Sequence, residues 1–182
     1  MNRKKIRERL RQFRTLPEKE YKKEFIFCLL TPQSRAQKCW QAVEELSKLK
    51  SPTKNQITKI LKTKTRFHNV KTERILKNNW DKIKPRLSSS DIPQLRNFLV
   101  KNVNGYGLKE ASHFLRNIGK SNNQIAILDR HILRNLNVKK IKSPKHYLEI
   151  EQSFLNLARK IKVSPDELDL LWWSKENGEI FK

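Results

Sequence analysis

The sequence predicts an all-α protein. Apolar residues recur at intervals of three and four through most of the 182 residues, as they do on one face of an α-helix. No stretch alternates convincingly between apolar and polar residues, which is the pattern of a half-buried strand. Serine, threonine or aspartate, often followed by proline, precedes several of the periodic stretches, as is typical of helix N-termini. We therefore expect short capped helices throughout, and we find no internal repeat.

The expected helices can be placed by these start signals. In chain order they begin at Asn2, Thr15, Gln33, Ser51, Arg66, Asp91, Gly107, Asp129, Ser143 and Ser164. Thr15 and Glu18 have the spacing of a capping box, and the apolar run that follows, residues 25–30, is expected to be buried on most sides. The helix that begins at Arg66 should continue until Pro85 stops it.

The net charge indicates a polyanionic partner. Lysine and arginine total 41 and aspartate and glutamate total 18, so the formal net charge is +23. Nucleic acid is the simplest partner for such a chain, although a solvated basic surface or an acidic lipid surface would also fit. If the partner is nucleic acid, binding should weaken steeply with salt, because each neutralised phosphate releases counterions.

The two cysteines, Cys28 and Cys39, lie in apolar helical surroundings. We expect buried free thiols rather than a disulfide framework. The N-terminus is charged and lacks the apolar segment of a signal peptide, and no run is long enough to span a membrane. The expected protein is therefore intracellular and soluble, with no membrane partner.

Gly105-Tyr106-Gly107 predicts a tight hairpin between two helices. The whole chain has four glycines, so two at one turn indicate a backbone requirement there. A helix that starts behind such a turn presents free backbone N–H groups that can bind phosphate. An ordinary turn between helices is the alternative, because a single GxG pattern is weakly specific. Gly119 stands where the C-cap of the second helix is expected.

The hairpin and the residues after it resemble the helix-hairpin-helix DNA glycosylases. The lysine enzymes of that superfamily have GxGxK at the hairpin and a carboxylate soon after the second helix, and this sequence matches with Gly105 to Lys109 and with Asp129. Four segments are similar to the short 8-oxoguanine DNA glycosylases of the second type, found in archaea and some bacteria. They are TPQSRA at 31–36, SHFLRNIG at 112–119, AILDRH at 126–131 and LWW at 171–173.

The resemblance implies that Lys109 is a nucleophile and Asp129 its carboxylate partner, in a cleft between two helical lobes. One lobe would comprise residues 30–120 and end with the helix-hairpin-helix, and the other would comprise 1–29 with 121–182. A carboxylate stabilises the positive charge that develops on the sugar, and a neutral amine can attack the anomeric carbon. The resulting imine permits β-elimination. From the residues alone, Lys109 could be a plain surface lysine and Asp129 a helix N-cap, a role that is compatible with catalysis.

The resemblance also implies a pocket for the extruded base. Aromatic rings would sandwich the oxidised guanine, with Phe67 and Trp173 as candidates, and the terminal carboxylate of Lys182 would lie near the base. Gln33 and Ser34 would face the target nucleotide. Structural alternatives exist: the two rings could belong to the core, Ser34 could cap the helix that starts there, and the tail could fray.

Contacts to the DNA backbone are expected from Gly105 and Gly107 and from His131, which could instead orient the catalytic carboxylate or only pack. The family often holds a monovalent cation on hairpin carbonyls, for which Val103 and Tyr106 are the candidates; such an ion would be structural. Some relatives carry an iron–sulfur cluster on four cysteines, which this chain cannot supply. Its histidines lack zinc-ligand spacing, and no cofactor is expected to be required.

The expected function is a bifunctional DNA repair glycosylase that excises 8-oxoguanine and cleaves the abasic strand by β-elimination through a lysine Schiff base. Its partner would be double-stranded DNA containing 8-oxoguanine, and it would act as a monomer. One alternative is a non-enzymatic helix-hairpin-helix module that grips the DNA backbone. Another is a glycosylase for a different base lesion.

Overall fold

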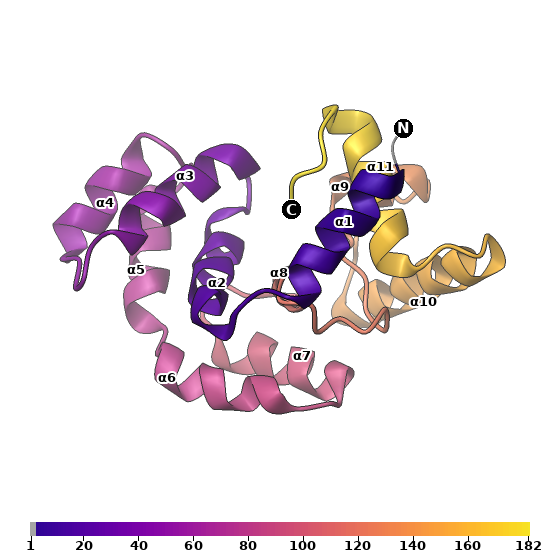
Figure 1. The fold of residues 1–182 in the computed structure, drawn as a ribbon, viewed down its shortest axis with the longest axis horizontal. Coiled ribbons are helices and arrows are strands. Elements are labelled where there is room, and N and C mark those ends of the chain that lie inside the picture. The colour runs from indigo at the N-terminus through magenta and orange to yellow at the C-terminus, as the bar shows by residue number, and fades with distance from the viewer. Residues whose placement is uncertain (1–2) are drawn as a thin grey trace.

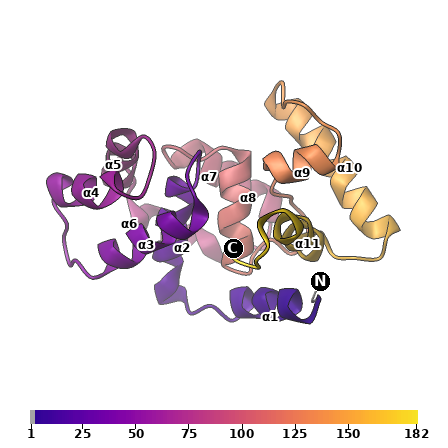
Figure 2. The ribbon, with the colours of Figure 1, turned by 90° about the horizontal axis from the view of Figure 1, so that it is seen from above.

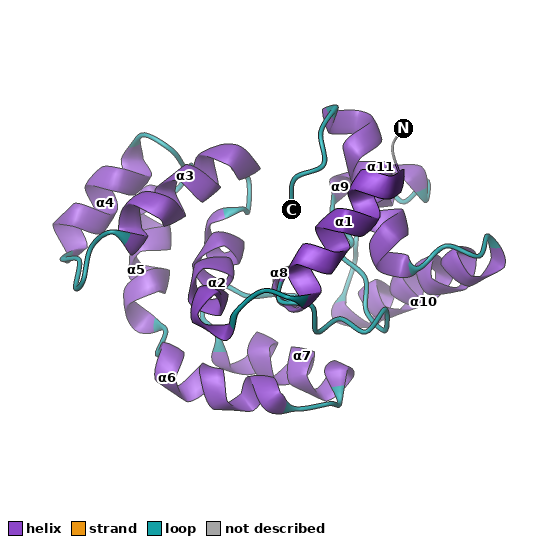
Figure 3. Cartoon of the chain, viewed as in Figure 1, coloured by secondary structure: helices purple, strands orange, loops and turns teal. Residues whose placement is uncertain are grey.

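The computed structural model describes residues 3–182, with the backbone alone at residue 177. These residues form eleven α-helices and two short 3₁₀ helices, and no strand occurs among them, so the predicted fold class is confirmed. The α-helices are α1 (Arg3–Arg14), α2 (Tyr21–Leu30), α3 (Ala36–Ser47), α4 (Lys54–Lys62), α5 (His68–Lys77), α6 (Trp80–Ile83), α7 (Ile92–Asn102), α8 (Leu108–Asn117), α9 (Arg130–Asn135), α10 (Pro144–Lys160) and α11 (Pro165–Asn177). The 3₁₀ helices are η1 (Glu18–Glu20) and η2 (Lys84–Ser88). Figure 3 shows the loops that join them.

Two groups of helices flank a central pair (Figures 1 and 2). The central helices α2 and α8 pack against each other, and α7 packs on α8 across the hairpin. On one side α2 contacts α3 and α5, and α4 packs on α5; on the other side α11 contacts α1, α9 and α10. The C-terminus lies between the two groups in both views. Within residues 3–182, no helix combines the length and the apolar character that a bilayer crossing requires.

Buried apolar side chains gather in three clusters. The largest is formed by α2, α3, α7, α8 and their neighbours, with Phe27 and Phe114 fully buried in it. The second surrounds Phe154 of α10, and the third joins α1 to Leu170 of α11. The clusters therefore group α2 with α3 and α8, whereas the predicted lobe boundary at residue 30 assigns α2 to the other lobe. The division into two lobes stays a prediction.

Several predicted helix starts are capped as expected. The side chains of Asp91, Asp129, Ser143 and Ser164 each accept a backbone N–H from the first turn of the helix that follows. These bonds satisfy N–H groups that have no partner within the helix. The predictions succeed because an N-cap depends only on residues that are adjacent in the sequence.

Gly119 ends α8 as predicted, and it is also a point of close approach. Its φ is +70°, and the N–H groups of Gly119 and Lys120 donate to the last turn of α8. A Cβ at this position would lie 2.5 Å from the Cα of Arg14, so α1 packs directly on the glycine backbone. No other residue fits there without moving α1.

Three predicted starts are wrong, and the first is Gln33, because α3 begins at Ala36. Thr15 caps no helix: its hydroxyl donates back to the Arg11 carbonyl at 3.1 Å, and the chain passes through η1 before α2 begins. Ser51 is replaced as the cap by Thr53, whose side chain accepts from Gln56 N while the Gln56 side chain accepts from Thr53 N at 2.8 Å. The sequence contains both Ser51-Pro52 and the Thr53–Gln56 capping box, and α4 is capped by the Thr53–Gln56 pair.

The helix predicted to run from Arg66 to Pro85 is broken in two. Asn78 is extended, with ψ 124°, and its side chain exchanges hydrogen bonds with the backbone of Asn104: Nδ2 donates to the carbonyl at 3.0 Å and Oδ1 accepts the N–H at 2.8 Å. Asn79 then caps α6. The bonds to Asn104, next to the hairpin, offset those lost at the break, and no local pattern reveals them.

A buried ion pair joins α7, which packs on the central helix α8, to α10. Arg96 of α7 donates to both carboxylate oxygens of Glu151 of α10, at 2.5 and 2.9 Å. The Ala126 N–H donates to the same carboxylate at 2.7 Å, and Arg96 also donates to Ser112 of α8 at 3.2 Å. A buried pair is tolerated when its oxygens are hydrogen-bonded in this way. The pair holds the chain at residue 126, three residues before Asp129.

Candidate active site

A cavity of about 960 Å³ lies between the two groups of helices. It is lined by the loop before α3, by α8, by the segment that enters α9, by α11 and by the C-terminal residue. The predicted site residues among its lining are Gln33, Ser34, Lys109, Asp129, His131, Trp173 and Lys182. The fold thus brings side chains from distant parts of the sequence to one cavity.

Lys109 stands in the first turn of α8, directly after the hairpin. Its side chain is one-third exposed, and its Nζ lies 2.9 Å from Glu110 Oε1. Glu110 Oε2 accepts the Gly107 N–H at 3.1 Å, so that N–H is not free, contrary to the prediction. A helix N-terminus disfavours a nearby ammonium group, and the Glu110 carboxylate offsets that effect. Lys109 therefore has a carboxylate beside it and faces the cavity.

Asp129 is the N-cap of α9 and also lines the cavity. Its Oδ1 accepts the N–H groups of His131 at 2.8 Å and Ile132 at 2.9 Å. Both capping bonds go to Oδ1, so Oδ2 takes no part in capping the helix. The cap holds the carboxylate in place, because two backbone N–H groups of α9 donate to it. Capping and catalysis are compatible at this residue, as predicted.

Two further residues of α8 line the cavity beside Lys109. His113 and Arg116 follow it at the four- and seven-residue spacing of one helix face. Burial, together with the cations Arg116, Lys109 and Lys182, holds the pKa of His113 well below its usual range, so its imidazole is neutral. Neither residue was predicted, although their spacing from Lys109 was a usable signal.

Asp169 of α11 faces Arg116 in the same cavity. Both side chains are buried, and Arg116 Nη1 lies 3.5 Å from Asp169 Oδ2. Burial raises the pKa of Asp169 to about 7, although the Arg116 charge acts in the opposite direction. The Nε and Nη1 atoms of Arg116 have no hydrogen-bond partner within the described residues. The cavity is therefore polar and suits a guest that can form hydrogen bonds.

The C-terminal tail is docked and does not fray. The Lys182 ammonium pairs with the buried carboxylate of Glu24 on α2 and lies 3.3 Å from the centroid of the Trp40 ring. Glu24 also accepts from Asn117 of α8 at 2.8 Å. Trp173 of α11 is partly buried and lines the cavity near this tail residue. The fold therefore closes one side of the cavity with the end of the chain.

Gln33 and Ser34 lie in the loop between α2 and α3. Gln33 has φ +55°, a left-handed conformation that costs a non-glycine residue energy. Ser34 does not cap α3, which begins at Ala36 after an N-cap residue, Arg35, that makes no side-chain cap bond. The Ser34 Oγ instead accepts the Arg66 N–H at 3.0 Å. The alternative of a capping role for Ser34 is wrong.

The family model described as 8-oxoguanine DNA glycosylase matches residues 6–163. The chain belongs to the 8-oxoguanine DNA glycosylase family. A relative from Fusobacterium nucleatum, named 8-oxoguanine DNA glycosylase/AP lyase, is 38% identical, with 97% of this chain and 91% of the relative covered. One of the same name from Methanocaldococcus jannaschii is 34% identical, with the same coverage.

Solved structures of the family share the fold. The crystal structure of the Methanocaldococcus jannaschii 8-oxoguanine glycosylase/lyase in complex with a 15mer DNA containing 8-oxoguanine gives a TM-score of 0.88 at 32% identity, over 98% of this chain and 92% of that one. The 8-oxoguanine DNA glycosylase of Thermotoga maritima gives 0.87 at 31% identity, over 97% and 91%. The resemblance inferred from the hairpin and the tail is therefore confirmed.

Not every residue that the family resemblance implied lines the cavity. Phe67 is 52% exposed, has φ +56° and carries the Arg66 guanidinium 5.4 Å from its ring centroid. It is not a core residue, so that alternative is wrong. Its neighbours Thr65 and Arg66 line the cavity, and its role in stacking on the base stays a prediction.

The family's hairpin is built as a tight backbone turn. Gly105 has φ +99°, and a Cβ there would lie 2.5 Å from Cδ of Arg74, so the glycine is required. The Val103 carbonyl accepts the Tyr106 N–H at 3.1 Å, which leaves one lone pair on that oxygen. The Tyr106 ring is buried, and its hydroxyl donates to a carbonyl of α2. A monovalent cation on the Val103 and Tyr106 carbonyls stays a prediction.

His131 joins α9 to α11. Its Nδ1 pairs with Glu176, and its Nε2 accepts from Arg130 Nε at 3.3 Å. Its backbone N–H, rather than its ring, orients Asp129. Both ring nitrogens have protein partners, so a phosphate contact by the ring requires one of them to move. That contact stays a prediction.

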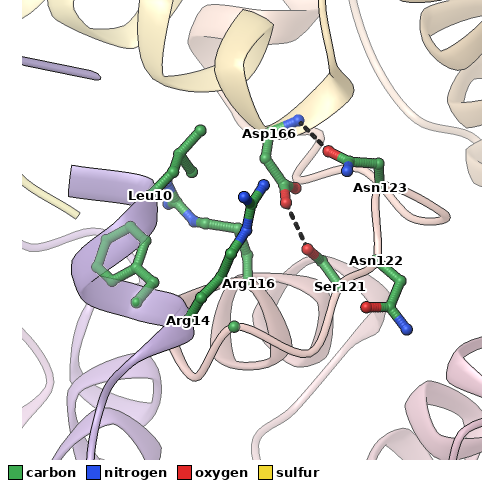
Figure 4. A pocket seen from close by; sticks show the side chains of 9 residues that line it. Leu10, Arg14, Arg116, Ser121, Asn122, Asn123 and Asp166 are labelled. Carbon is green, nitrogen blue, oxygen red and sulfur yellow. Dashed lines mark hydrogen bonds between the residues drawn. The ribbon is translucent and has the colours of Figure 1, made fainter. Parts of the chain in front are cut away.

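A smaller cavity of about 240 Å³ lies on the other side of Arg116, between α1 and the loop after α8 (Figure 4). Ser121 Oγ donates to Asp166 Oδ2 at 2.5 Å, and Asp166 N donates to Asn123 at 3.4 Å. These bonds tie the start of α11 to the loop. The residues around this cavity connect α1, α8 and α11. Asp169 lies one turn after Asp166 along α11.

Proposed function

We propose that this protein excises 8-oxoguanine from double-stranded DNA and then cleaves the abasic strand. The observation that carries the proposal is that Lys109 and Asp129 line one cavity in a chain that belongs to the 8-oxoguanine DNA glycosylase family. Relatives that share a third or more of their residues with it bear the name 8-oxoguanine DNA glycosylase/AP lyase.

The base must first leave the duplex, since C1′ of its sugar is otherwise out of reach. The neutral amine of Lys109 attacks C1′ and the N-glycosidic bond breaks. The base departs with the bonding electrons and takes up the proton that the Lys109 nitrogen loses after attack, passed on through Glu110. Asp129 stabilises the positive charge that builds on the sugar during this step. Glu110, 2.9 Å from the amine, is placed to take the proton that Lys109 must lose.

The sugar ring then opens to give an imine between C1′ and Nζ of Lys109. Loss of a proton from C2′ lets the bond to the 3′ phosphate break, which is the β-elimination. Hydrolysis of the imine returns the free lysine. One residue therefore serves both activities, and losing it should abolish both.

The base pocket is proposed on the side of the cavity closed by α11 and the tail. Trp173 supplies one stacking face, and Phe67 the other once DNA is bound. Gln33, Ser34 and the terminal carboxylate of Lys182 provide polar contacts to the nucleotide. A polar cavity with a tryptophan ring in its lining suits recognition of a flat, polar base.

The hairpin is proposed to hold the DNA backbone. Gly105 and Gly107 bring the main chain close to a phosphate, with His131 as a further contact, and a monovalent cation on the Val103 and Tyr106 carbonyls would bridge protein and phosphate. No cofactor is required for the chemistry above. Because the proposed substrate is genomic DNA, we expect the protein to work inside the cell. We also expect it to act as a monomer.

Borohydride trapping tests the proposal. Duplex DNA with one 8-oxoguanine should give a covalent adduct with the wild type and none with Lys109→Gln, because reduction fixes the imine. Lys101→Gln changes an exposed lysine of α7 and is the matched control, which should trap like the wild type. No adduct at any salt concentration would favour a DNA-gripping module. A panel of other lesions decides whether 8-oxoguanine is the substrate.

A further inference from the structure

Lys71 of α5 is a buried lysine without a carboxylate partner. Its side chain is 1% exposed, and no carboxylate of residues 3–182 lies within ion-pair distance of it. Burying a lone ammonium group is costly, so such groups are retained where they make strong hydrogen bonds. Nothing in the proposed chemistry uses this residue. Its partners therefore show what it does.

Its three hydrogen-bond partners lie at the last residue of α2 and in the loop that follows it, at the wall of the large cavity. Lys71 Nζ donates to the Leu30 carbonyl at 2.6 Å, to the Pro32 carbonyl at 2.9 Å and to Ser34 Oγ at 2.8 Å. An ammonium group has three protons and no lone pair, so these bonds use its whole capacity. They hold a loop that contains Gln33 in a strained conformation, and such strain persists only where the surroundings fix it.

The bonds also determine what the Ser34 hydroxyl can do. Its oxygen accepts from Lys71 Nζ and from the Arg66 N–H, so both lone pairs are occupied. What remains is one O–H, which can only donate. Ser34 lines the cavity. The Cys39 sulfur lies beside it and is a weak acceptor for the Ser34 O–H. An oxygen or nitrogen acceptor of the bound nucleotide is the stronger partner.

We propose that Lys71 is a positioning residue that, with the Arg66 N–H, makes Ser34 a hydrogen-bond donor to an acceptor atom of the extruded nucleotide. The inference rests on the proposed function, because it needs a nucleotide in the cavity. Lys71 acts through Ser34 and touches no reacting atom. Without Lys71, the hydroxyl can turn its proton inward, and the donor is lost.

A double-mutant cycle tests this coupling. The variants are Lys71→Met, which keeps the side chain up to the position of Cε and removes its donors, Ser34→Ala, and both together. Each single variant should lower the single-turnover rate of 8-oxoguanine excision about tenfold, as expected for one lost hydrogen bond in the transition state. If Lys71 acts through Ser34, the double variant should be no more than about threefold slower than Ser34→Ala.

Thr72→Val is the matched control. Thr72 is the next residue of α5, is fully buried and bonds to Thr58 at 3.2 Å rather than to the loop. It should change the excision rate less than about twofold even where the melting temperature falls. Effects of Lys71→Met and Ser34→Ala that multiply to about a hundredfold would overturn the inference. So would an unchanged rate in Lys71→Met.

A pH profile answers the same question if Lys71→Met does not fold. The pKa of Lys71 is lowered to about 8, chiefly by burial and also by the charges of Arg74, Arg66 and Lys109, whereas Cys39 acts in the opposite direction. Above that pH the neutral amine has a lone pair that can accept the Ser34 proton. The ratio of wild-type to Ser34→Ala excision rates should be about ten below pH 8 and should approach one above it. A ratio that does not change with pH contradicts the inference.

The outcomes separate this inference from the function on which it rests. A wild type that excises 8-oxoguanine but shows multiplicative effects retains the function and loses the role of Lys71. A wild type that excises a different lesion corrects the substrate, and the cycle is then measured with that lesion. A wild type without glycosylase activity overturns both.

Discussion

Tyr147→Phe removes a hydroxyl group that holds the segment leading into Asp129. The Tyr147 hydroxyl donates to the Ala126 carbonyl at 2.7 Å and accepts the Leu128 N–H at 3.3 Å. The substitution leaves both buried backbone groups without this partner and creates no cavity beyond the lost oxygen. Each unsatisfied buried group costs about 1–3 kcal/mol, and the longer bond belongs at the low end, so the free energy of unfolding should fall by about 2–4 kcal/mol.

The segment that Tyr147 holds leads directly into Asp129. A displaced carboxylate loses its alignment with the reacting carbon, and a shift of about 1 Å can slow a reaction by about a hundredfold. We therefore expect single-turnover excision to slow at least about tenfold in Tyr147→Phe.

Urea unfolding followed by circular dichroism gives the stability change, and duplex cleavage under single-turnover conditions gives the rate. Tyr21→Phe, at the partly exposed start of α2, is the control and should change the free energy of unfolding by less than about 0.5 kcal/mol. A loss below about 1 kcal/mol together with an unchanged rate would refute the reasoning.

Three further outcomes follow from the structure. Gly105→Ala should destabilise the fold by about 1–2 kcal/mol and weaken DNA binding, measured by thermal unfolding and fluorescence anisotropy, because φ is +99° and the Arg74 side chain must move. Deletion of Lys182 should reduce base excision more than strand cleavage at a ready-made abasic site, and equal losses would count against a role of the tail in the base pocket. Burial raises the pKa of Asp169 to about 7, so the folded state keeps a proton that the unfolded chain releases above about pH 4. The contribution of Asp169 to the free energy of unfolding should therefore fall as the pH rises from about 4 to about 7, and Asp169→Asn should remove this fall in pH-dependent denaturation curves.

The charge distribution also bears on how the proposed site works. The cavity contains Lys109, Arg116 and Lys182 within a strongly basic chain, yet Glu110, Asp169 and Glu24 each lie beside one of these cations. A cation whose charge is balanced at short range costs less to bury. The net charge of +23 then attracts DNA at long range.

Local chemistry was readable without coordinates. The caps at Asp91, Ser143 and Ser164, and the glycine end of α8, involve side chains and backbone groups within a few residues of one another. The recurrence of apolar residues at intervals of three and four predicted helices for the same reason. Lys109 and Asp129 could be named because the motif that contains them is short and is similar to that of a known family.

The contents of the cavity were a different matter. Ser34 was equally consistent with a cap or a substrate contact until the Arg66 N–H and Lys71 were seen to share its oxygen. Phe67 was a candidate for stacking on the base, with the core as the alternative, and it is exposed. For Ser34, the partners that decide the role come from another part of the chain.

The amino-acid order thus dictates where helices start and stop, where the chain turns on glycine, and which family the chain resembles, since those properties depend on neighbours along the backbone. Burial and charge pairing depend on residues that meet only after folding, as Lys71 meets Leu30, Arg96 meets Glu151 and Lys182 meets Glu24. A lysine reads the same in sequence whether it is solvated or enclosed. A sequence motif makes Lys109 a candidate nucleophile, but only the fold shows that Lys71 holds a loop and that Lys182 closes the cavity.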